Sequence, residues 1–221
     1  MINLMLGDCL ERMKEIPDGS VDMILTDPPY GTTACKWDSI IPLEPMWEQL
    51  KRIIKPNGAI VMTASQPFTS VLVSSNLKMF KYCWTWDKVL HSNPLIAKKQ
   101  PLNANEDITV FYSKQVNYNP QMVAGDKSLN RIGNNTHKTA TKGSTPHTIS
   151  KNKTGMRYPK RIITIPNTKR GGLHPTQKPV ALMEYLIKTY TNEGETVLDF
   201  TMGSGTTGVA AKNLNRDFIG I

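Results

Sequence analysis

Apolar and polar residues follow two different periods along the first 115 residues of the chain. Some apolar runs are short and continuous or rich in β-branched and aromatic residues, which favours strands, and others recur at helical spacing. The expected strands cover residues 21–26, 59–63, 81–88 and 107–113, and the expected helices cover residues 43–58 and 67–77. Pro56-Asn57-Gly58 is expected to stop the first helix, and Pro67 to begin the second. This alternation predicts an α/β domain with a mainly parallel sheet.

The pattern disappears between residues 116 and 172, where Asn, Thr, Lys, Gly and Ser dominate and only residues 161–166 resemble a strand. Regular elements return after that point. They are expected to be a helix from Pro179 to Gly194, a strand over 196–200, a helix over 206–215 and a last strand from 217. The sequence therefore predicts a doubly wound α/β fold, interrupted by a loop-rich insert.

Composition narrows the class of protein. A hydrophobic content of 39% in 221 residues is enough for a core. No apolar run reaches the roughly 18 residues that a transmembrane helix needs. The N-terminal stretch "MINLMLGDCLERMK" does not resemble a signal peptide, so a cytoplasmic protein is expected. Cys9, Cys35 and Cys83 are widely spaced, which favours neither a zinc site nor a disulfide framework.

The net charge of +9 is concentrated in the insert. Residues 117–172 hold 11 Lys or Arg and a single acid, whereas the rest of the chain holds 16 basic and 17 acidic residues. A neutral body with one basic insert favours a polyanionic partner that contacts the insert. A solvated, flexible loop would carry the same charges, so composition alone leaves both explanations open.

The sequence "ILTDPPYG" at residues 24–31 is an unusual end for a buried strand. An apolar run stops at a carboxylate, two prolines and an aromatic ring, Asp27 to Tyr30. Prolines restrict the backbone, and an aromatic ring offers a flat face. This combination suits the binding of a flat ligand better than a simple turn. A rigid loop with a capping Asp is the structural alternative.

A second motif, "TMGSGTTG", follows the expected strand at residues 196–200. Glycines after a strand let the backbone approach a ligand, and the next helix offers free N–H groups. Gly203, Gly205 and Gly208 also satisfy the GxGxxG spacing of dinucleotide-binding proteins. A nicotinamide-dependent oxidoreductase is therefore one candidate, and a purely structural turn is another. Against the oxidoreductase, such enzymes carry this loop in their first strand-helix unit, and here it comes last.

Both motifs stand at the carboxyl ends of strands, where open α/β sheets bind ligands. If the two strands are neighbours, Asp27 and the glycine loop face one crevice. This pairing resembles the S-adenosylmethionine-dependent DNA methyltransferases that act on amino groups, because DPPY and D-F-x-x-G-S-G are the catalytic and cofactor motifs of that family. The catalytic motif comes first, as in the permuted β class. The segments "ASQPFTS", "NEDITVFYSK" and "HPTQKPVALMEYLIKTYTNEGETVLDF" extend the resemblance over nearly the whole chain except the insert.

The resemblance implies a domain organisation and a reaction. It implies a catalytic half over residues 1–115, a target recognition region over 116–172 and a cofactor-binding half over 173–221. The target base is expected to flip out of duplex DNA. Asp27 and the Pro28 carbonyl would accept hydrogen bonds from its amino group, Pro29 would help to fix the loop, and Tyr30 would stack on the base. The amine would then attack the methyl group directly and in line.

The resemblance also implies a set of residues that bind S-adenosyl-L-methionine. They are Asp199, Phe200, Thr201, Gly203, Ser204, Gly205 and Thr206, with Thr176 and Lys178 as partners for the cofactor's carboxylate. Asp8 falls where the family places a group near the cofactor's adenine, although it equally fits a helix N-cap. Candidate DNA contacts in the insert are Lys151, Lys153, Arg157, Lys160 and Arg161. A metal site is not expected.

Several alternatives remain open from the sequence. Asp at the first position of DPPY favours N6 of adenine, and N4 of cytosine is the second candidate. Family members carry a Glu directly after the strand that ends here at Ile221, so weakened cofactor affinity is expected, and a catalytically inactive DNA-binding remnant is a further reading. Double-stranded DNA is the expected partner. A homodimer and a restriction endonuclease partner are other associations that the family suggests.

Overall fold

The structure, a computed structural model, describes residues 1–35, 38–92, 94–125, 154–167 and 177–221. The chain divides into two compact units. The first unit comprises Met1–Asn119 with Lys160–Ile221, and the second comprises Pro120–Pro159. In the described part of the second unit, β6 (Val123–Ala124) pairs antiparallel with β7 (Met156–Arg157). The fold of the first unit positions the candidate site.

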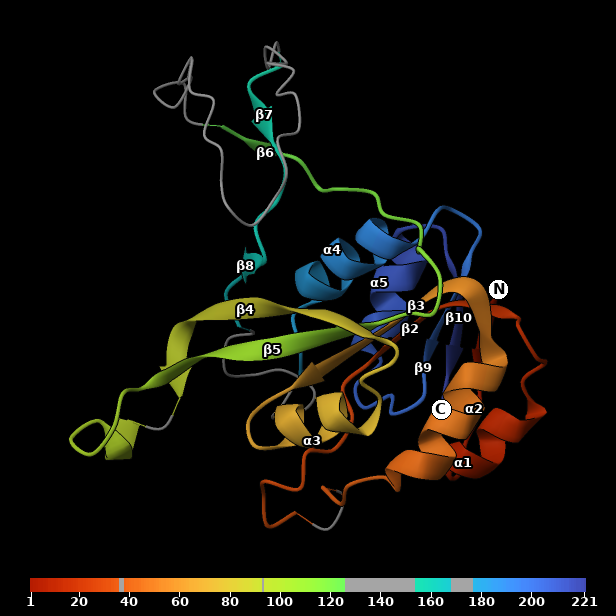
Figure 1. Ribbon diagram of the computed structural model, residues 1–221, viewed down its shortest axis with the longest axis horizontal. Helices are drawn as coiled ribbons and strands as arrows, with labels where there is room; N and C mark the ends of the chain where they lie inside the picture. The colour runs from red at the N-terminus through yellow and green to blue at the C-terminus, as the bar shows by residue number, and fades with distance from the viewer. Residues whose placement is uncertain (36–37, 93, 126–153, 168–176) are drawn as a thin grey trace, which may run out of the picture. The chain divides into compact units, whose positions relative to one another are not determined.

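The first unit is built on an eight-stranded sheet among the described residues (Figure 1). Its strands, in spatial order, are β1 (Ile2–Leu4), β10 (Asp217–Gly220), β9 (Thr196–Asp199), β2 (Val21–Thr26), β3 (Ile54–Ala64), β5 (Asn103–Phe111), β4 (Phe80–Ser92) and β8 (Ile162–Thr164). Neighbouring strands are parallel except where β5 pairs antiparallel with β3 and with β4. The predicted mainly parallel sheet is confirmed.

Helices cover both faces of this sheet, which confirms the doubly wound arrangement (Figure 1). One face carries α1 (Cys9–Arg12), α2 (Leu43–Ile53) and α3 (Phe68–Ser75), and the other carries α4 (Val180–Tyr190) and α5 (Thr206–Asn213). Two short 3-10 helices, Met13–Glu15 and Pro94–Ile96, complete the described helical elements. The strands between the two layers are buried on both sides, which explains why β2 is apolar along nearly its whole length.

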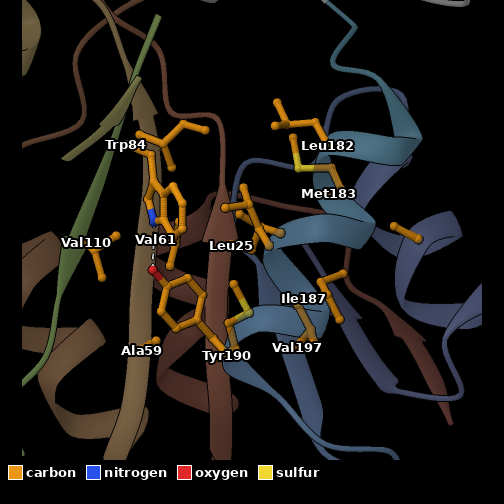
Figure 2. Packing of buried hydrophobic residues seen from close by; sticks show 14 of the residues in the cluster. Leu25, Ala59, Val61, Trp84, Val110, Leu182, Met183, Ile187, Tyr190 and Val197 are labelled. Atoms are coloured by element: carbon orange, nitrogen blue, oxygen red, sulfur yellow. Dashed lines mark hydrogen bonds between the residues drawn. The ribbon is translucent and has the colours of Figure 1, made fainter. Parts of the chain in front are cut away.

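The core beneath α4 combines aliphatic packing with a polar anchor (Figure 2). Leu182 and Ile187 of α4 belong to the same buried cluster as Leu25 of β2. Within the cluster, the Trp84 indole Nε1–H donates to the Tyr190 hydroxyl at 2.8 Å. Because a buried indole N–H needs an acceptor, this bond fixes the C-terminal end of α4 against β4. The other end of α4, its N-terminus, begins just after Lys178 and lies near the carboxyl end of β2.

Several boundaries differ from those expected, most clearly at the ends of two helices and at the starts of β3 and β5. Helix α2 ends at Ile53, and Pro56-Asn57-Gly58 lie inside β3 as an irregular insertion, because Ile54 pairs with Val21 and Ala59 already pairs with Met23. Helix α4 ends at Tyr190 rather than at Gly194. There, Arg216 Nη2 donates to the Thr191 carbonyl at 2.9 Å, which satisfies an orphan group of the helix end.

The strands at the two edges of the main sheet are β1 and β8. Strand β1 has no counterpart among the expected elements, because three exposed residues carry no periodic signal. Strand β8 confirms the strand expected within residues 161–166, and it pairs with β4 in the main sheet rather than in the second unit. None of the helices in the described ranges is both long and apolar enough to cross a bilayer.

Candidate active site

The two motifs meet at one edge of the sheet. Strands β2 and β9 are parallel neighbours, with Met23 opposite Val197 and Ile24 opposite Leu198. Their carboxyl ends border a cavity of about 880 Å³ in the first unit. That volume lies within the range of small-molecule sites, about 300–1,000 Å³. The two strands are therefore neighbours, as the sequence analysis required for the two motifs to face one crevice.

Asp199, at the end of β9, is a buried carboxylate held by neutral donors. Its Oδ1 accepts from the Thr26 hydroxyl at 2.7 Å and from the Thr201 backbone N–H at 3.2 Å. Its Oδ2 accepts from the Thr207 hydroxyl at 2.7 Å. Burial raises the pKa of Asp199 to about 6, against the pull of these hydrogen bonds, because removal from water disfavours the charged form.

Asp27, directly after β2, is surrounded by three donors from different parts of the chain. Its Oδ1 accepts from the Tyr30 hydroxyl at 2.7 Å and from the Thr63 hydroxyl at the end of β3. Its Oδ2 forms an ion pair with Lys178 Nζ at 2.6 Å. Thr63 and Lys178 reach Asp27 because β3 and the segment before α4 both end beside β2.

Lys178 belongs to a larger group of charges. Its Nζ also lies 3.5 Å from Glu106 Oε2, and Glu106 Oε1 lies 3.1 Å from Lys88 Nζ. Burial disfavours the Lys178 ammonium, but the charges of Asp27 and Glu106 outweigh that effect and raise its pKa. Lys178 therefore stays cationic in the interior.

The ring of Tyr30 stacks on Phe68 of α3, with centroids 5.4 Å apart and planes inclined by 21°. Lys178 Nζ lies 5.8 Å from the centroid of the same ring. Burial first, and then the charges of Asp27 and Glu106, raise the pKa of Tyr30 well above its usual value. The phenol therefore remains a hydrogen-bond donor to Asp27.

The loop after Tyr30 is fastened by a single carboxylate, Asp38. Asp38 Oδ1 accepts from the N–H groups of Tyr30 and Gly31, at 2.8 and 2.9 Å. Asp38 Oδ2 accepts from those of Thr32 and Thr33, at 2.9 and 2.7 Å. Burial raises the pKa of Asp38, but these bonds outweigh it and hold the pKa below its usual value. The DPPY turn is thus fixed from its C-terminal side.

The glycines of the TMGSGTTG motif have two different structural tasks. Gly203 and Gly205 face open space where a Cβ would stand, and Gly205 adopts a φ of +77°, which glycine accommodates without strain. At Gly208, inside α5, a Cβ would come within 2.7 Å of the Phe218 ring of β10. The first two glycines therefore leave room at the cavity, and the third allows α5 to pack closely on the sheet.

Most of the residues expected at the site border this one cavity. They are Asp8, Asp27, Pro28, Pro29, Tyr30, Lys178, Asp199, Phe200, Thr201, Gly203, Ser204, Gly205 and Thr206. Asp8 is also the N-cap of α1, since its Oδ1 accepts from the Leu10 N–H at 2.9 Å. The two explanations offered for Asp8 are therefore compatible. Thr176 lies outside the described residues.

The candidate DNA contacts are distributed differently. Lys151 and Lys153 lie outside the described residues, and Arg157 lies on β7 of the second unit. Lys160 and Arg161 belong to the first unit. The Arg161 guanidinium lies 4.9 Å from the ring centroid of Tyr82 on β4.

Several residues of the site escaped the sequence analysis, among them Thr26 and Thr207, which donate to Asp199. Thr63 stands at the carboxyl end of a strand next to β2, and this position was a usable signal. Asp38, Lys88 and Glu106 carried none, because their roles depend on a loop conformation and on the pairing of β4 with β5. Within the described ranges, no group of three or more His, Cys, Asp or Glu side chains is arranged to hold a metal ion.

The fold and the cavity define a class, that of the DNA methyltransferases. The family model described as "DNA methylase" matches residues 21–221, so the chain belongs to that family. Over 234 residues, the chain is 29% identical to the type II methyltransferase M.HpaI of Haemophilus parainfluenzae. The matched region covers 99% of this chain and 69% of that relative. The structure of the M1.HpyAVI–SAM complex matches with a TM-score of 0.66 and 26% identity, covering 100% of this chain and 93% of the other. The cytosine-N4-specific PvuII DNA methyltransferase matches with a TM-score of 0.67 and 18% identity, covering 99% and 80%.

Proposed function

We propose that this protein transfers a methyl group from S-adenosyl-L-methionine to the N6 amino group of adenine in double-stranded DNA. The observation that carries the proposal is the shared cavity, in which the DPPY turn and the glycine loop stand on adjacent parallel strands. One motif supplies acceptors for an amine, and the other supplies space and N–H groups for a cofactor. The solved complex of M1.HpyAVI with SAM, on a similar fold, supports the choice of cofactor.

The charge of the cavity fits this cofactor. Among the described residues that line the cavity, the charged side chains are Asp8, Asp27, Asp38, Glu106 and Asp199, with Lys178 as the single cation. A lining with this excess of carboxylates favours a ligand with a net positive charge, and the sulfonium gives the cofactor that charge. The same lining is unfavourable for the phosphates of a nicotinamide dinucleotide. The residue set therefore fits the cofactor and disfavours the oxidoreductase alternative.

When bound, the cofactor supplies an electrophilic methyl group. The chain's residues have the tasks of binding and orientation. In the proposal, Asp199 and the stretch from Phe200 to Thr206 hold the amino acid end of the cofactor, and Asp8 lies near its adenine. Thr176 joins them as a proposed partner of the cofactor's carboxylate.

The target base is proposed to bind on the DPPY side of the cavity. Asp27 and the Pro28 carbonyl accept hydrogen bonds from the amino group, and the prolines restrict the backbone. Tyr30, packed on the buried Phe68, offers an aromatic surface for the base, and such stacking contributes about 1–3 kcal/mol. Flipping brings the base to these groups.

Adenine is proposed over cytosine because Asp occupies the first position of the DPPY motif. Cytosine N4 remains the second candidate, since the fold is shared with the cytosine-N4-specific PvuII enzyme. Both amines require the same two acceptors and the same in-line attack. The base identity therefore depends on a product analysis.

The basic insert is proposed to contact the DNA. Lys151, Lys153, Arg157, Lys160 and Arg161 would bind mainly phosphates, so affinity should fall steeply with salt. A homodimer and a partnership with a restriction endonuclease are further parts of the proposal, suggested by the family resemblance alone. Sedimentation of the purified protein, alone and with DNA, tests the first of these.

The decisive test is a nucleoside analysis. Duplex DNA is incubated with S-adenosylmethionine and the protein, or its Asp27→Ala variant, and digested for mass spectrometry. Asp18→Ala is the matched control, because Asp18 is an exposed carboxylate paired with Arg52 away from the cavity. N6-methyl-2′-deoxyadenosine with the wild type and the control, but not with Asp27→Ala, is the expected result. N4-methyl-2′-deoxycytidine would show that cytosine, rather than adenine, is the target base. Retained DNA binding without any methylated nucleoside would favour an inactive DNA-binding protein.

A further inference from the structure

Two buried lysines and two partly buried carboxylates form an ionic cluster beside the cavity. Lys178 pairs with Asp27 at 2.6 Å and with Glu106 at 3.5 Å, and Lys88 pairs with Glu106 at 3.1 Å. The lysine side chains are only 9% and 8% exposed. Burying charges costs free energy that a well-packed apolar cluster would not cost. The cluster therefore points to a task other than stability.

The hydrogen bonds of Asp27 show which acceptor sites of its carboxylate are occupied. A carboxylate offers about two acceptor sites on each oxygen. On Asp27, Oδ1 accepts from Tyr30 and Thr63, which fills it. Within the described part of the chain, Oδ2 accepts from Lys178 alone, which leaves one acceptor site on that oxygen. The three donors thus fix the rotation of the carboxyl group and direct a single acceptor site.

We propose that Lys178 is a positioning residue that keeps Asp27 ionised and turned so that the remaining acceptor site of Oδ2 serves the methyl-accepting nitrogen, and that the Glu106–Lys88 pair restrains Lys178. This inference rests on the proposed function. It assigns Lys178 to the carboxylate of the DPPY motif, whereas the sequence resemblance had assigned it to the cofactor.

The bond change that depends on this arrangement is a proton transfer. After methylation the amine nitrogen carries a positive charge. Its N–H bond then breaks, the electron pair stays on nitrogen, and the proton forms an O–H bond with Oδ2 of Asp27, from which it passes to water. A methylated amino group of this kind is a strong acid, so a weakly basic carboxylate suffices, provided that it is ionised beforehand.

Other charged or titratable groups also face Asp27 from the surrounding described elements. They are Tyr30 in the same turn, Asp199 on β9, Glu106 on β5 and Lys178 before α4, with Lys88 on β4 behind Glu106 and with Asp8 and Asp38 elsewhere in the cavity lining. Lys178 is the cation in direct contact with Asp27. Its loss leaves the carboxylate among acidic neighbours, which favours protonation of Asp27 at higher pH.

The first test measures protonation without DNA or cofactor. The carboxyl group of Asp27 is followed by ¹³C NMR during a pH titration and is assigned by difference from Asp27→Asn. In Lys178→Met, the titration midpoint should rise, because the cation in direct contact with Asp27 is lost. Lys178→Arg keeps the charge and should retain a midpoint close to that of the wild type. Lys88→Met should produce a smaller rise, because it acts through Glu106.

Lys55→Met is the matched control. Lys55 also pairs with a carboxylate of β2, Asp22, at 2.7 Å, but it does not border the cavity. Its replacement should leave the Asp27 midpoint unchanged. The acidic limb of the pH–rate profile for methyl transfer should then move in the same order, furthest in Lys178→Met and not at all in Lys55→Met.

An unchanged midpoint in a folded Lys178→Met variant would overturn the inference, and so would an equal rise in the Lys55→Met control. Should Lys178→Met fail to fold, an unchanged midpoint in Lys88→Met together with an altered one in Lys178→Arg would overturn it as well. Failure of the wild type to methylate any nucleoside would instead overturn the proposed function. The NMR titration requires neither substrate, so the two failures are distinguishable.

Discussion

Asp27 and Asp199 are two carboxylates at the ends of adjacent strands, yet their surroundings differ. Asp27 contacts a buried ammonium at 2.6 Å, whereas the hydrogen bonds of Asp199 come from two hydroxyl groups and a backbone N–H. The neutral donors leave the burial cost of the Asp199 charge largely uncompensated, and the pKa of Asp199 rises to about 6. Neighbouring acids on one sheet edge thus acquire different electrostatic environments through their different partners.

The largest effect should come from exchanging each acid for its amide. Asp27→Asn removes the proton acceptor and should lower kcat by about 10²–10⁴-fold, with cofactor affinity nearly unchanged. Asp199→Asn should instead weaken cofactor binding by about 10–100-fold, as expected for the loss of a hydrogen bond to a charged group, with kcat largely retained at saturation. Calorimetry and single-turnover methylation measure the two quantities. The comparison fails if both variants lose the same quantity.

A second effect concerns stability as a function of pH. The folded-state pKa of Asp199, about 6, lies above its usual value of 3.8. The folded protein therefore holds this proton more tightly than the unfolded chain, so the contribution to stability is fully present below about pH 4 and is lost as pH rises through 6. Relative to Asp199→Asn, the wild type should lose on the order of 2 kcal/mol of unfolding free energy between pH 4 and 7. Urea unfolding at several pH values measures it, and parallel curves for the two proteins would contradict the expectation.

The smallest effect concerns the loop beside Asp27. Asp38 accepts four backbone N–H bonds, and Asp38→Asn replaces one of its two acceptor oxygens with a donor. The change should cost about 1–2 kcal/mol of unfolding free energy near neutral pH. Because the pKa of Asp38 is lowered by folding, this contribution is lost as pH falls through the folded-state value. Thermal unfolding at pH 7 and at acidic pH measures the difference, and an equal cost at both pH values would refute this account.

Local sequence was sufficient for much of the fold. Strand β2 was predicted to the residue, because its apolar run is bounded by Ser20 and by Asp27 with its prolines. The end of α2 was misplaced because Ile53 and Ile54 continue the apolar pattern while the second of them already pairs in the sheet. An apolar residue fits a buried helix end and a buried strand equally well, and only the tertiary pairing decides between them.

The site could be predicted only in part, because several of its contacts also depend on tertiary pairing. The cavity lining follows from two motifs that stand at strand ends. The partner of Lys178 does not follow, because the contact with Asp27 joins residues 151 positions apart and depends on where the segment before α4 meets β2. The pairing of Lys88 with Glu106 likewise depends on the register between β4 and β5.

The carboxylates around the cavity have one more consequence. A protein with a net charge of +9 attracts a polyanion over long distances, whereas the described lining of the cavity, with five carboxylates and one lysine, disfavours phosphate groups at short range. A heterocyclic ring carries no charge and meets no such barrier. For the flipped nucleotide of the proposed reaction, this lining would favour entry of the ring over entry of the sugar–phosphate chain.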